Sequence, residues 1–372
     1  MEYFRLPPAD FGWETFQPPL YYVVSAGVAG MARGLGAGKA ALLECLQAES
    51  LAISRGVLAM GVVCSRILFL RAEQRERMAL IGAVAVFPAL VFCASRISND
   101  VLYTLAAFVW LAALLRFCRR PTTAGWAGVA LAVGVGLITK SVSLAFIPIS
   151  LAVLLLEQPM SRARKLSFLA LFAGIVVLVA GWFQIGRALE SGNSSTFVAG
   201  NIAILDRELS FDWRLAKEVS FDPLFVLRHP FCSPWAGDPH RDIFWEYFFK
   251  SAFFGEWSYP AIGLARVVVG GAMALLPLLA FGLVRLGWRS RQCGRPLALV
   301  LAGMVGAQLA WVMKEPFTCD QDIRGSLILV VPGIYFILGG IEGLPGRWKK
   351  MGYGLLWAEA AACLAWMLSL LP

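Results

Sequence analysis

Polar and ionisable side chains gather at four places in this chain, each at the end of a long apolar run. A carboxylate can take a proton from a hydroxyl, and a fixed cation or amide can hold a group that gains negative charge. Ionisable residues near membrane depth are costly to keep there, so they mark candidate functional sites. If the apolar runs end on the same side, these residues line one cavity. The four clusters are Glu14 with Gln17; Arg96 with Asn99 and Asp100; Lys140; and Asp320 with Asp322 and Arg324.

The composition indicates which elements position these clusters. Of the 372 residues, 59% are hydrophobic and 15% are charged, and the mean hydropathy is +0.69. Soluble proteins average about 45–50% apolar and about 25% charged residues. The values exclude a water-soluble globule and predict an all-α, polytopic membrane protein with about ten transmembrane helices of about 20 residues each. The expected spans are Leu51–Leu70, Ala79–Ala94, Val101–Leu115, Ala124–Ile138, Ser141–Leu156, Leu166–Ile185, Ala261–Leu283, Pro296–Val312, Ser326–Ile341 and Met351–Leu371.

Lysine and arginine are distributed unevenly between alternate connections. Sixteen lie in one set of loops, and four lie in the other set. Basic residues concentrate on the cytoplasmic side of membrane proteins, so the first set is expected to be cytoplasmic and the four polar clusters extracytoplasmic. The net charge of +9 then needs no nucleic-acid partner. The first set is Arg71, Arg75, Arg77, Arg116, Arg119, Arg120, Arg162, Arg164, Lys165, Arg285, Arg289, Arg291, Arg295, Arg347, Lys349 and Lys350; the second is Arg96, Lys140, Lys314 and Arg324.

One connection on the extracytoplasmic side is long. The segment Glu190–Tyr259 carries ten acidic and six basic residues and is rich in tryptophan and phenylalanine. Long loops of this kind usually carry function, so we expect a small folded cap. The expected organisation is therefore an N-terminal extracytoplasmic or interfacial segment (1–50), a transmembrane core (51–188), the large extracytoplasmic loop (189–259) and C-terminal transmembrane helices (260–372). The apolar run Pro18–Gly34 either crosses the bilayer or lies at its outer interface, and charge counting allows both.

Several short stretches resemble motifs of one enzyme family. Phe16-Gln17-Pro18-Pro19-Leu20-Tyr21-Tyr22 resembles a "K/H/Q-P-P-L-Y-Y" element, and Ile97-Ser98-Asn99-Asp100-Val101-Leu102 resembles an "S-N-D-x-L" turn. The run Gly134 to Lys140 followed by Pro148, and the run Phe244 to Gly255, resemble two further elements. Arg324-Gly325-Ser326 before Pro332 is loosely similar to "G-R-Y-x-x-P", without its tyrosine. In order and placement, these stretches resemble GT-C superfamily membrane glycosyltransferases of the dolichyl-phosphate-mannose–protein mannosyltransferase-like branch.

The resemblance implies a GT-C-like fold and the transfer of a sugar from a polyprenyl-phosphate donor to an extracytoplasmic glycan, lipid or protein acceptor. It also implies that the "PPLYY" helix lies on the extracytoplasmic interface and favours a bacterial inner (plasma) membrane. The polyprenyl-phosphate sugar is then a co-substrate, no other cofactor is assigned, and the need for a divalent metal stays open. The expected roles are donor-phosphate binding by Gln17, Lys140 and Arg324, catalysis by Glu14 and Asp100, shaping of the mouth by Asn99, and sugar or acceptor stacking by Trp235, Trp245 and Trp257.

The chain departs from the family's pattern near its start. The usual catalytic carboxylate of the family lies in a loop ahead of the "PPLYY" element, where this chain offers only Asp10 and Glu14 after Glu2. Three explanations stay open: a truncated start, an inactive relative, or a base replaced by Glu14, Asp100 or another acid. The resulting alternatives to an active transferase are a catalytically inactive GT-C-like subunit and a transporter or lipid flippase, which would need inverted repeats or polar residues at the bilayer midplane.

Metal binding has one candidate sequence. Asp320-Gln321-Asp322 places two carboxylates where they could hold a divalent cation, although acids at a membrane edge are an equally simple interpretation. His229 and His240 lie too far apart in the sequence for a helical metal pair, and no cysteine–histidine cluster indicates zinc. We therefore assign no metal ligands from the sequence.

Overall fold

The structure is a computed structural model that describes residues 17–69, 74–191, 209–235, 237–287 and 293–371. These residues form helices joined by turns, and an isolated antiparallel bridge links Ser210 to Phe317. The all-α prediction is confirmed for the described residues. The α-helices are α1 Leu20–Gly34, α2 Lys39–Leu68, α3 Gln74–Val86, α4 Pro88–Ser95, α5 Asn99–Arg119, α6 Thr123–Leu137, α7 Phe146–Ala152, α8 Arg162–Val176, α9 Trp182–Ser191, α11 Leu215–Glu218, α12 Pro223–Arg228, α13 Phe244–Phe254, α14 Ile262–Gly287, α15 Gly294–Lys314, α16 Val330–Glu342 and α17 Gly346–Leu368.

Seven of the described helical segments are long and apolar enough to cross a membrane. An eighth is the pair α3 and α4, which bend by 48° where α4 begins at Pro88. Proline cannot donate the backbone hydrogen bond that a continuous helix would need there. Two shorter apolar helical segments, Thr123–Leu137 and Ser141–Glu157, match the remaining expected spans. The chain is thus a helical, multi-pass membrane protein, and the main difference from the expected spans is that α2 begins at Lys39 rather than Leu51.

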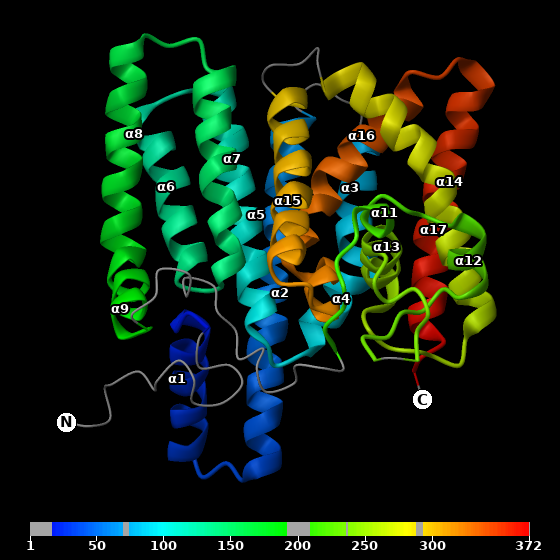
Figure 1. Ribbon diagram of the computed structural model, residues 1–372, viewed down its shortest axis with the longest axis horizontal. Coiled ribbons are helices and arrows are strands. Elements are labelled where there is room, and N and C mark those ends of the chain that lie inside the picture. Colours follow the sequence, from blue (N-terminus) through cyan, green and yellow to red (C-terminus); the bar gives the residue numbers. More distant parts are fainter. Residues whose placement is uncertain (1–16, 70–73, 192–208, 236, 288–292, 372) are drawn as a thin grey trace.

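The basic connections meet at one end of the molecule, which we call the basic end. Arg119 at the end of α5 donates to the Leu68 carbonyl at the end of α2, and Arg164 donates to the Pro121 carbonyl. Arg295 pairs with Glu157, and Arg75 pairs with Glu342. These contacts join the α7–α8 and α16–α17 connections to the same end, the upper one in Figure 1. Arg71, Arg289 and Arg291 lie outside the described residues.

The opposite end holds α1, the cap and the polar clusters, and we call it the site end. The backbone amide of Leu20 donates to the Ile138 carbonyl at 2.9 Å, which places the start of α1 beside the end of α6. From there α1 packs against the first part of α2, and both extend below the other helices in Figure 1. The helix α1 therefore lies alongside α2 and extends beyond the other helices of the bundle.

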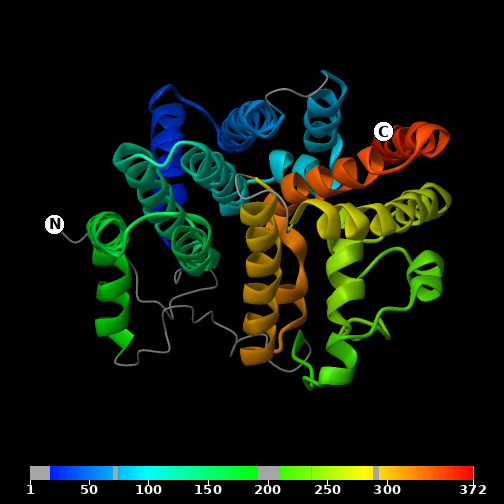
Figure 2. The ribbon, with the colours of Figure 1, turned by 90° about the horizontal axis from the view of Figure 1, so that it is seen from above.

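Aromatic side chains pack against one another along the cap helix α13. Along α13, Phe244 stacks on Phe248 and Phe249 meets Phe253 edge to face. The cap also joins the chain after α15, because Phe211 donates its amide to the Pro316 carbonyl at 3.1 Å and Gln321 donates to the Arg241 carbonyl at 2.7 Å. Figure 2 shows α13 and the neighbouring cap helices on the side of α14, away from α6 and α8. The cap is thus fixed to the segment that carries Asp320, Asp322 and Arg324.

The closest helix contact in the core is that between α14 and α16. A Cβ added at Gly282 would overlap the Phe336 carbonyl and lie 2.7 Å from the Gly340 nitrogen. Small residues let helices approach closely in membranes. We expect Gly282→Ala to force the helices apart and to cost about 3 kcal/mol of stability. Thermal unfolding of the detergent-solubilised protein would measure this, with Gly263→Ala on the same helix as the control, since no heavy atom lies within 4 Å of a Cβ there. Equal melting temperatures for the two variants would contradict the expectation.

Candidate active site at the site end

Asp100 and Lys140 form a buried ion pair. Only 8% of the Asp100 side chain and 17% of the Lys140 side chain are exposed. Ser98 caps the start of α5: its hydroxyl accepts the Asp100 amide at 3.2 Å and donates to the Asp100 carboxylate at 2.9 Å. Lys140 follows α6 directly after a turn in which its own amide donates to the Gly136 carbonyl. Two helix ends that are separate in sequence therefore place an anion and a cation together.

A second ionic cluster surrounds Arg324. Its Nε donates to Asp322 Oδ2 at 2.9 Å, and its Nη2 donates to Glu256 Oε2 at 3.0 Å. The Tyr247 hydroxyl donates to the other Glu256 oxygen at 2.6 Å. The guanidinium is therefore held between two carboxylates, and the planar fork of arginine suits this arrangement.

Tyr103 on α5 links the two ionic clusters. Its hydroxyl donates to the Gly325 carbonyl at 2.6 Å, next to Arg324, and the centroid of its ring lies 5.9 Å from Lys140 Nζ. Arg324 is also close enough to Asp100 for their charges to interact. We call the set Asn99, Asp100, Lys140, Glu256, Asp322 and Arg324 the ion-pair site. It brings together three of the four sequence clusters.

The pKa of Glu256 is raised above its ordinary value of 4.5 because the carboxyl is buried and lies near the Asp322 carboxylate, although Arg324 and the Tyr247 hydroxyl act in the opposite direction. The folded protein therefore binds this proton more tightly than the unfolded chain does. The free energy that protonation of the Glu256 carboxyl contributes to folding is fully present below pH 4.5. It is lost as the pH rises through the raised pKa of the folded protein.

The pH dependence of stability tests this assignment. Glutamine cannot titrate, so the melting temperature of Glu256→Gln minus that of the wild type should increase as the pH rises from 4.5. Thermal unfolding in detergent across pH 4 to 8 would measure the difference. Glu315→Gln is the control at a more exposed carboxyl on the same end, whose side chain is 38% exposed. A flat difference for Glu256→Gln would contradict the assignment.

The chain between α15 and α16 is fixed by a small hydrogen-bond network. Gln308 on α15 donates to the carbonyls of Asp320 and Asp322 at 3.0 and 2.7 Å and accepts from Ser326 at 2.6 Å. The Asp320 carboxylate accepts from Trp311 Nε1 at 2.8 Å. Asp320 and Asp322 therefore face different partners, and the described residues contain no group of three or more metal-ligating side chains.

Gln17 lies at the start of the described chain, and its buried Oε1 has no hydrogen-bond partner among the described residues. The Leu20–Ile138 contact places this segment beside the turn that leads to Lys140. Asn99, next to Asp100, also has an unsatisfied buried atom: its Nδ2 lacks a hydrogen-bond partner in the described part of the chain. Glu14, the other acid expected here, lies outside the described residues. Unsatisfied buried groups such as these are costly, and a bound polar group would satisfy them.

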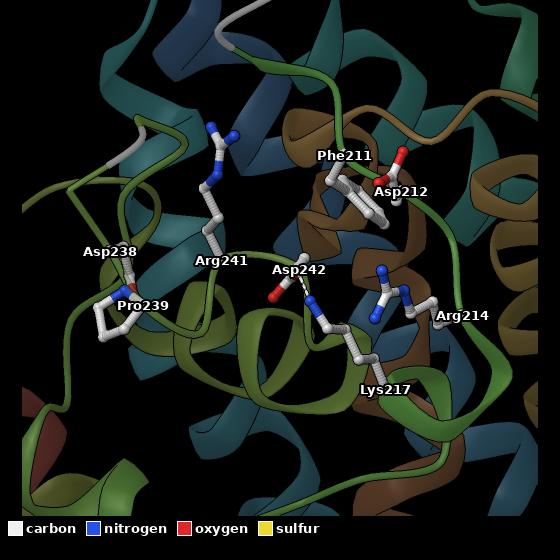
Figure 3. Close-up of a pocket in the computed structure, with 8 residues that line it drawn as sticks. All are labelled: Phe211, Asp212, Arg214, Lys217, Asp238, Pro239, Arg241 and Asp242. Atoms are coloured by element: carbon white, nitrogen blue, oxygen red, sulfur yellow. Dashed lines mark hydrogen bonds and ion pairs between the residues drawn. The ribbon is translucent and has the colours of Figure 1, made fainter.

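The cap contains a polar cavity of about 410 Å³ beside the segment that leads to the ion-pair site (Figure 3). Lys217 pairs with Asp242, and Figure 3 shows the Arg214 guanidinium between Phe211 and Lys217. Arg241 donates to the carbonyls of Pro234 and Ser210. The lining residues are Phe211, Asp212, Arg214, Lys217, Asp238, Pro239, Arg241 and Asp242. This cavity offers charged hydrogen-bonding groups and one aromatic face.

The three tryptophans expected to stack on a sugar do not line this cavity. Trp235 and Trp257 are 52% and 57% exposed, whereas Trp245 packs edge-on against Phe244. Trp257 is next in sequence to Glu256, and the Arg96 guanidinium lies 5.8 Å from the centroid of its ring. Of the three, Trp257 is therefore the one placed beside the ion-pair site.

Sequence reasoning missed several residues of the site. Glu256 and Tyr247 come from the cap, and Tyr103 and Gln308 lie inside expected spans. The sequence offered two signals for these residues. Glu256 is a carboxylate directly after the "F-F-G" stretch, and Tyr103 and Gln308 are single hydrogen-bonding side chains within apolar runs. Their roles follow from contacts between residues far apart in the sequence.

No protein-family model and no curated protein matches this chain. Among solved structures, the chain is similar to the crystal structure of ArnT from Cupriavidus metallidurans in the apo state. The identity is 15%, the TM-score is 0.37, and the match covers 92% of this chain and 67% of that one.

Proposed function

We propose that the protein is a GT-C-like glycosyltransferase of the dolichyl-phosphate-mannose–protein mannosyltransferase-like type, which transfers a sugar from a polyprenyl-phosphate donor to an extracytoplasmic acceptor. The observation that carries the proposal is the ion-pair site itself. It combines cations and carboxylates at one end of a helical membrane bundle, opposite the basic end. The positive-inside rule assigns the basic end to the cytoplasm and the site end to the exterior, in our proposal that of a bacterial inner membrane.

Lys140 and Arg324 are the proposed binding groups for the donor phosphate. When the bond between the sugar and the phosphate breaks, negative charge develops on the phosphate, and fixed cations stabilise that charge. Both side chains are held in place by carboxylates, so they need little reorganisation when the donor binds. The Gln17 side chain, from the segment beside Lys140, would supply a neutral hydrogen-bond donor.

Asp100 is the proposed catalytic carboxylate. Cleavage of a glycosidic bond leaves positive charge on the sugar C1 in an oxocarbenium-like transition state, which a nearby carboxylate would stabilise. The contact with Lys140 favours the charged form of Asp100, because an adjacent opposite charge opposes protonation. Asn99, adjacent at the start of α5, would shape the mouth of the site.

The cap cavity is the proposed entry for the acceptor. Its lining of aspartates and basic side chains beside Phe211 suits a hydroxyl-bearing ligand better than an apolar one, because charged groups there can hydrogen-bond to hydroxyls. The described contacts between the cap and the Asp320–Arg324 segment would direct such an acceptor toward the ion-pair site. Trp257, beside Glu256, would offer a stacking face for the sugar, with Trp235 and Trp245 as the more distant candidates.

Transfer in a reconstituted membrane tests the proposal. The full chain would be placed in liposomes with radiolabelled polyprenyl-phosphate sugars and an envelope extract that supplies glycan, lipid and protein acceptors. We expect protein-dependent movement of label from the donor to an acceptor. Arg214→Gln should raise the acceptor KM and leave the donor KM unchanged. Absence of transfer from every donor, with protein that is folded and correctly oriented, would reject the proposal.

A further inference from the structure

An arginine inside a spanning helix is not used by the mechanism proposed above. Arg55 lies on α2, one of the seven described helical segments that are long and apolar enough to cross a membrane. Its side chain is exposed, and it forms no hydrogen bond or ion pair with another described residue. A charge that faces lipid without a counter-ion is costly and marks a candidate functional site.

Arg55 lies at the centre of the face of α2 that turns away from the other helices. Residues three and four apart share a helix face, and the four such neighbours of Arg55 are all apolar and exposed: Leu51, Ala52, Leu58 and Ala59. The opposite face packs in the core, where a Cβ added at Gly61 would lie 3.2 Å from the Val84 side chain of α3. The arginine therefore sits in an apolar stripe that faces the bilayer, with no carboxylate within one turn of α2.

Contacts between α2 and α5 give the depth of Arg55. A Cβ added at Gly56 would lie 3.2 Å from the Leu105 side chain, and Arg119 donates to the Leu68 carbonyl at 3.3 Å. The two helices therefore run in the same direction, from the site end to the basic end. At about 1.5 Å per residue, α5 spans about 30 Å, which matches the hydrocarbon thickness of a bilayer. On the same scale, Arg55 lies about 8 Å inside the site end of that layer.

The charge of Arg55 can reach the headgroup layer at the site end. Side chains on an α-helix tilt toward its N-terminus, and α2 begins at the site end and ends at the basic end. The aliphatic stem of an arginine can lie along apolar surface while its guanidinium extends to the interface. The guanidinium is therefore expected at the level of the lipid phosphates of this leaflet.

A phospholipid fits both the charge and the apolar stripe. The guanidinium fork matches two oxygens of a phosphate, and phosphate is the anion that lipid headgroups offer at this level. Toward the basic end, the next basic residue on the same face is Arg66, also exposed, about 16 Å further along the helix. The apolar surface between the two arginines is close to half the hydrocarbon thickness, which is the depth that one acyl chain fills.

We propose that Arg55 binds the phosphate of an anionic phospholipid in the leaflet at the site end, with an acyl chain of that lipid along Leu58, Ala59 and Val62. The net negative charge of such a lipid complements the arginine, whereas a zwitterionic phospholipid also carries a cation, which the arginine repels. This site lies on the outer face of α2, apart from the ion-pair site. The inference therefore goes beyond the proposed function and does not depend on sugar transfer.

Photolabelling in nanodiscs tests the proposal on the full chain. The discs would contain a trace of phosphatidylglycerol or of phosphatidylcholine, each with a diazirine at the same position of one acyl chain, and mass spectrometry would measure the label on residues 51–62. We expect phosphatidylglycerol to label this segment about fivefold more than phosphatidylcholine, the preference that one basic residue gives near anionic lipid. Arg55→Gln should reduce the ratio to about one. The matched control is Arg66→Gln, at an exposed arginine on the same helix face, which should keep the wild-type ratio.

Four outcomes would overturn the inference. Two are equal labelling by the two lipids in the wild type and an unchanged ratio in Arg55→Gln. The third is stronger labelling by a diazirine-bearing polyprenyl phosphate than by phosphatidylglycerol, because the site would then belong to a lipid-linked sugar carrier. The fourth is protection of the segment from both lipids when two copies of the chain associate. The wild-type ratio and Arg55→Leu, which matches its apolar neighbours, keep the test decisive if Arg55→Gln does not fold.

Discussion

Replacing Lys140 by methionine is expected to lower kcat/KM for the polyprenyl-phosphate donor about 10³-fold. Methionine preserves much of the length of the lysine side chain but cannot carry charge. The loss should arise in two ways: the donor phosphate loses a cation, and Asp100 loses the partner that holds it. Initial rates at varied donor concentration in the reconstituted assay would measure the effect. Lys314→Met is the matched control, because Lys314 is a half-exposed lysine at the same end and lies outside the ion-pair site.

A double variant separates the lost chemistry from lost stability. Removing one member of a buried pair leaves an uncompensated charge and costs about 3–5 kcal/mol, so Lys140→Met alone should also melt at a lower temperature. The Lys140→Met/Asp100→Asn variant removes both charges and should regain much of the stability. It should remain inactive. Recovery of transfer together with stability would show that the pair is structural and would remove Lys140 from the mechanism.

The second large effect is expected at Arg324. Arg324→Lys keeps the positive charge but loses the fork that contacts Asp322 and Glu256 at 2.9 and 3.0 Å. An ammonium group cannot reproduce this planar arrangement. We expect kcat/KM to fall about 10²-fold, with a lower melting temperature because Glu256 loses its partner.

The control for Arg324 is an arginine that hydrogen-bonds to a backbone carbonyl among the described residues. Arg266 at the start of α14 donates to the Arg228 carbonyl at 3.1 Å, so Arg266→Lys should leave the transfer kinetics unchanged. Donor binding by Arg324→Lys can be measured separately with a labelled polyprenyl phosphate. If this variant binds and turns over the donor as the wild type does, the phosphate-binding role proposed for Arg324 is wrong.

The sequence predicted the helical membrane fold because long apolar runs leave few alternatives. It was less successful where a helix continues into polar residues. The segment from Lys39 to Ser50 contains Glu44, Gln47 and Glu49, which lower its hydropathy, yet these residues form helix readily and α2 includes them all. The bend at Pro88 was also missed, because a single proline within an apolar run does not specify whether a span breaks.

The candidate site was only partly predictable. Asp100, Lys140 and Arg324 could be proposed because each lies at the end of an apolar run on the side with few basic residues. Glu256 could not be placed, because its position depends on how the cap packs against Arg324, 68 residues further along the chain. Periodicity and charge counting give the side of the membrane on which a residue lies, whereas pairing between distant segments requires the tertiary structure.

The ionic contacts of the site suggest an order for its biogenesis. Asp100 and Lys140 are 40 residues apart and belong to the first half of the chain, whereas Glu256, Asp322 and Arg324 all belong to the second. At the site, a hydrogen bond from Tyr103 to the Gly325 carbonyl, across 222 residues, joins these two parts and involves no charged group. Each half can therefore neutralise its own charges at the site during synthesis, before the other half has been inserted. At the site end, nascent helices thus avoid leaving an isolated charge in lipid, which is costly, and the two parts of the site can dock afterwards through a neutral contact.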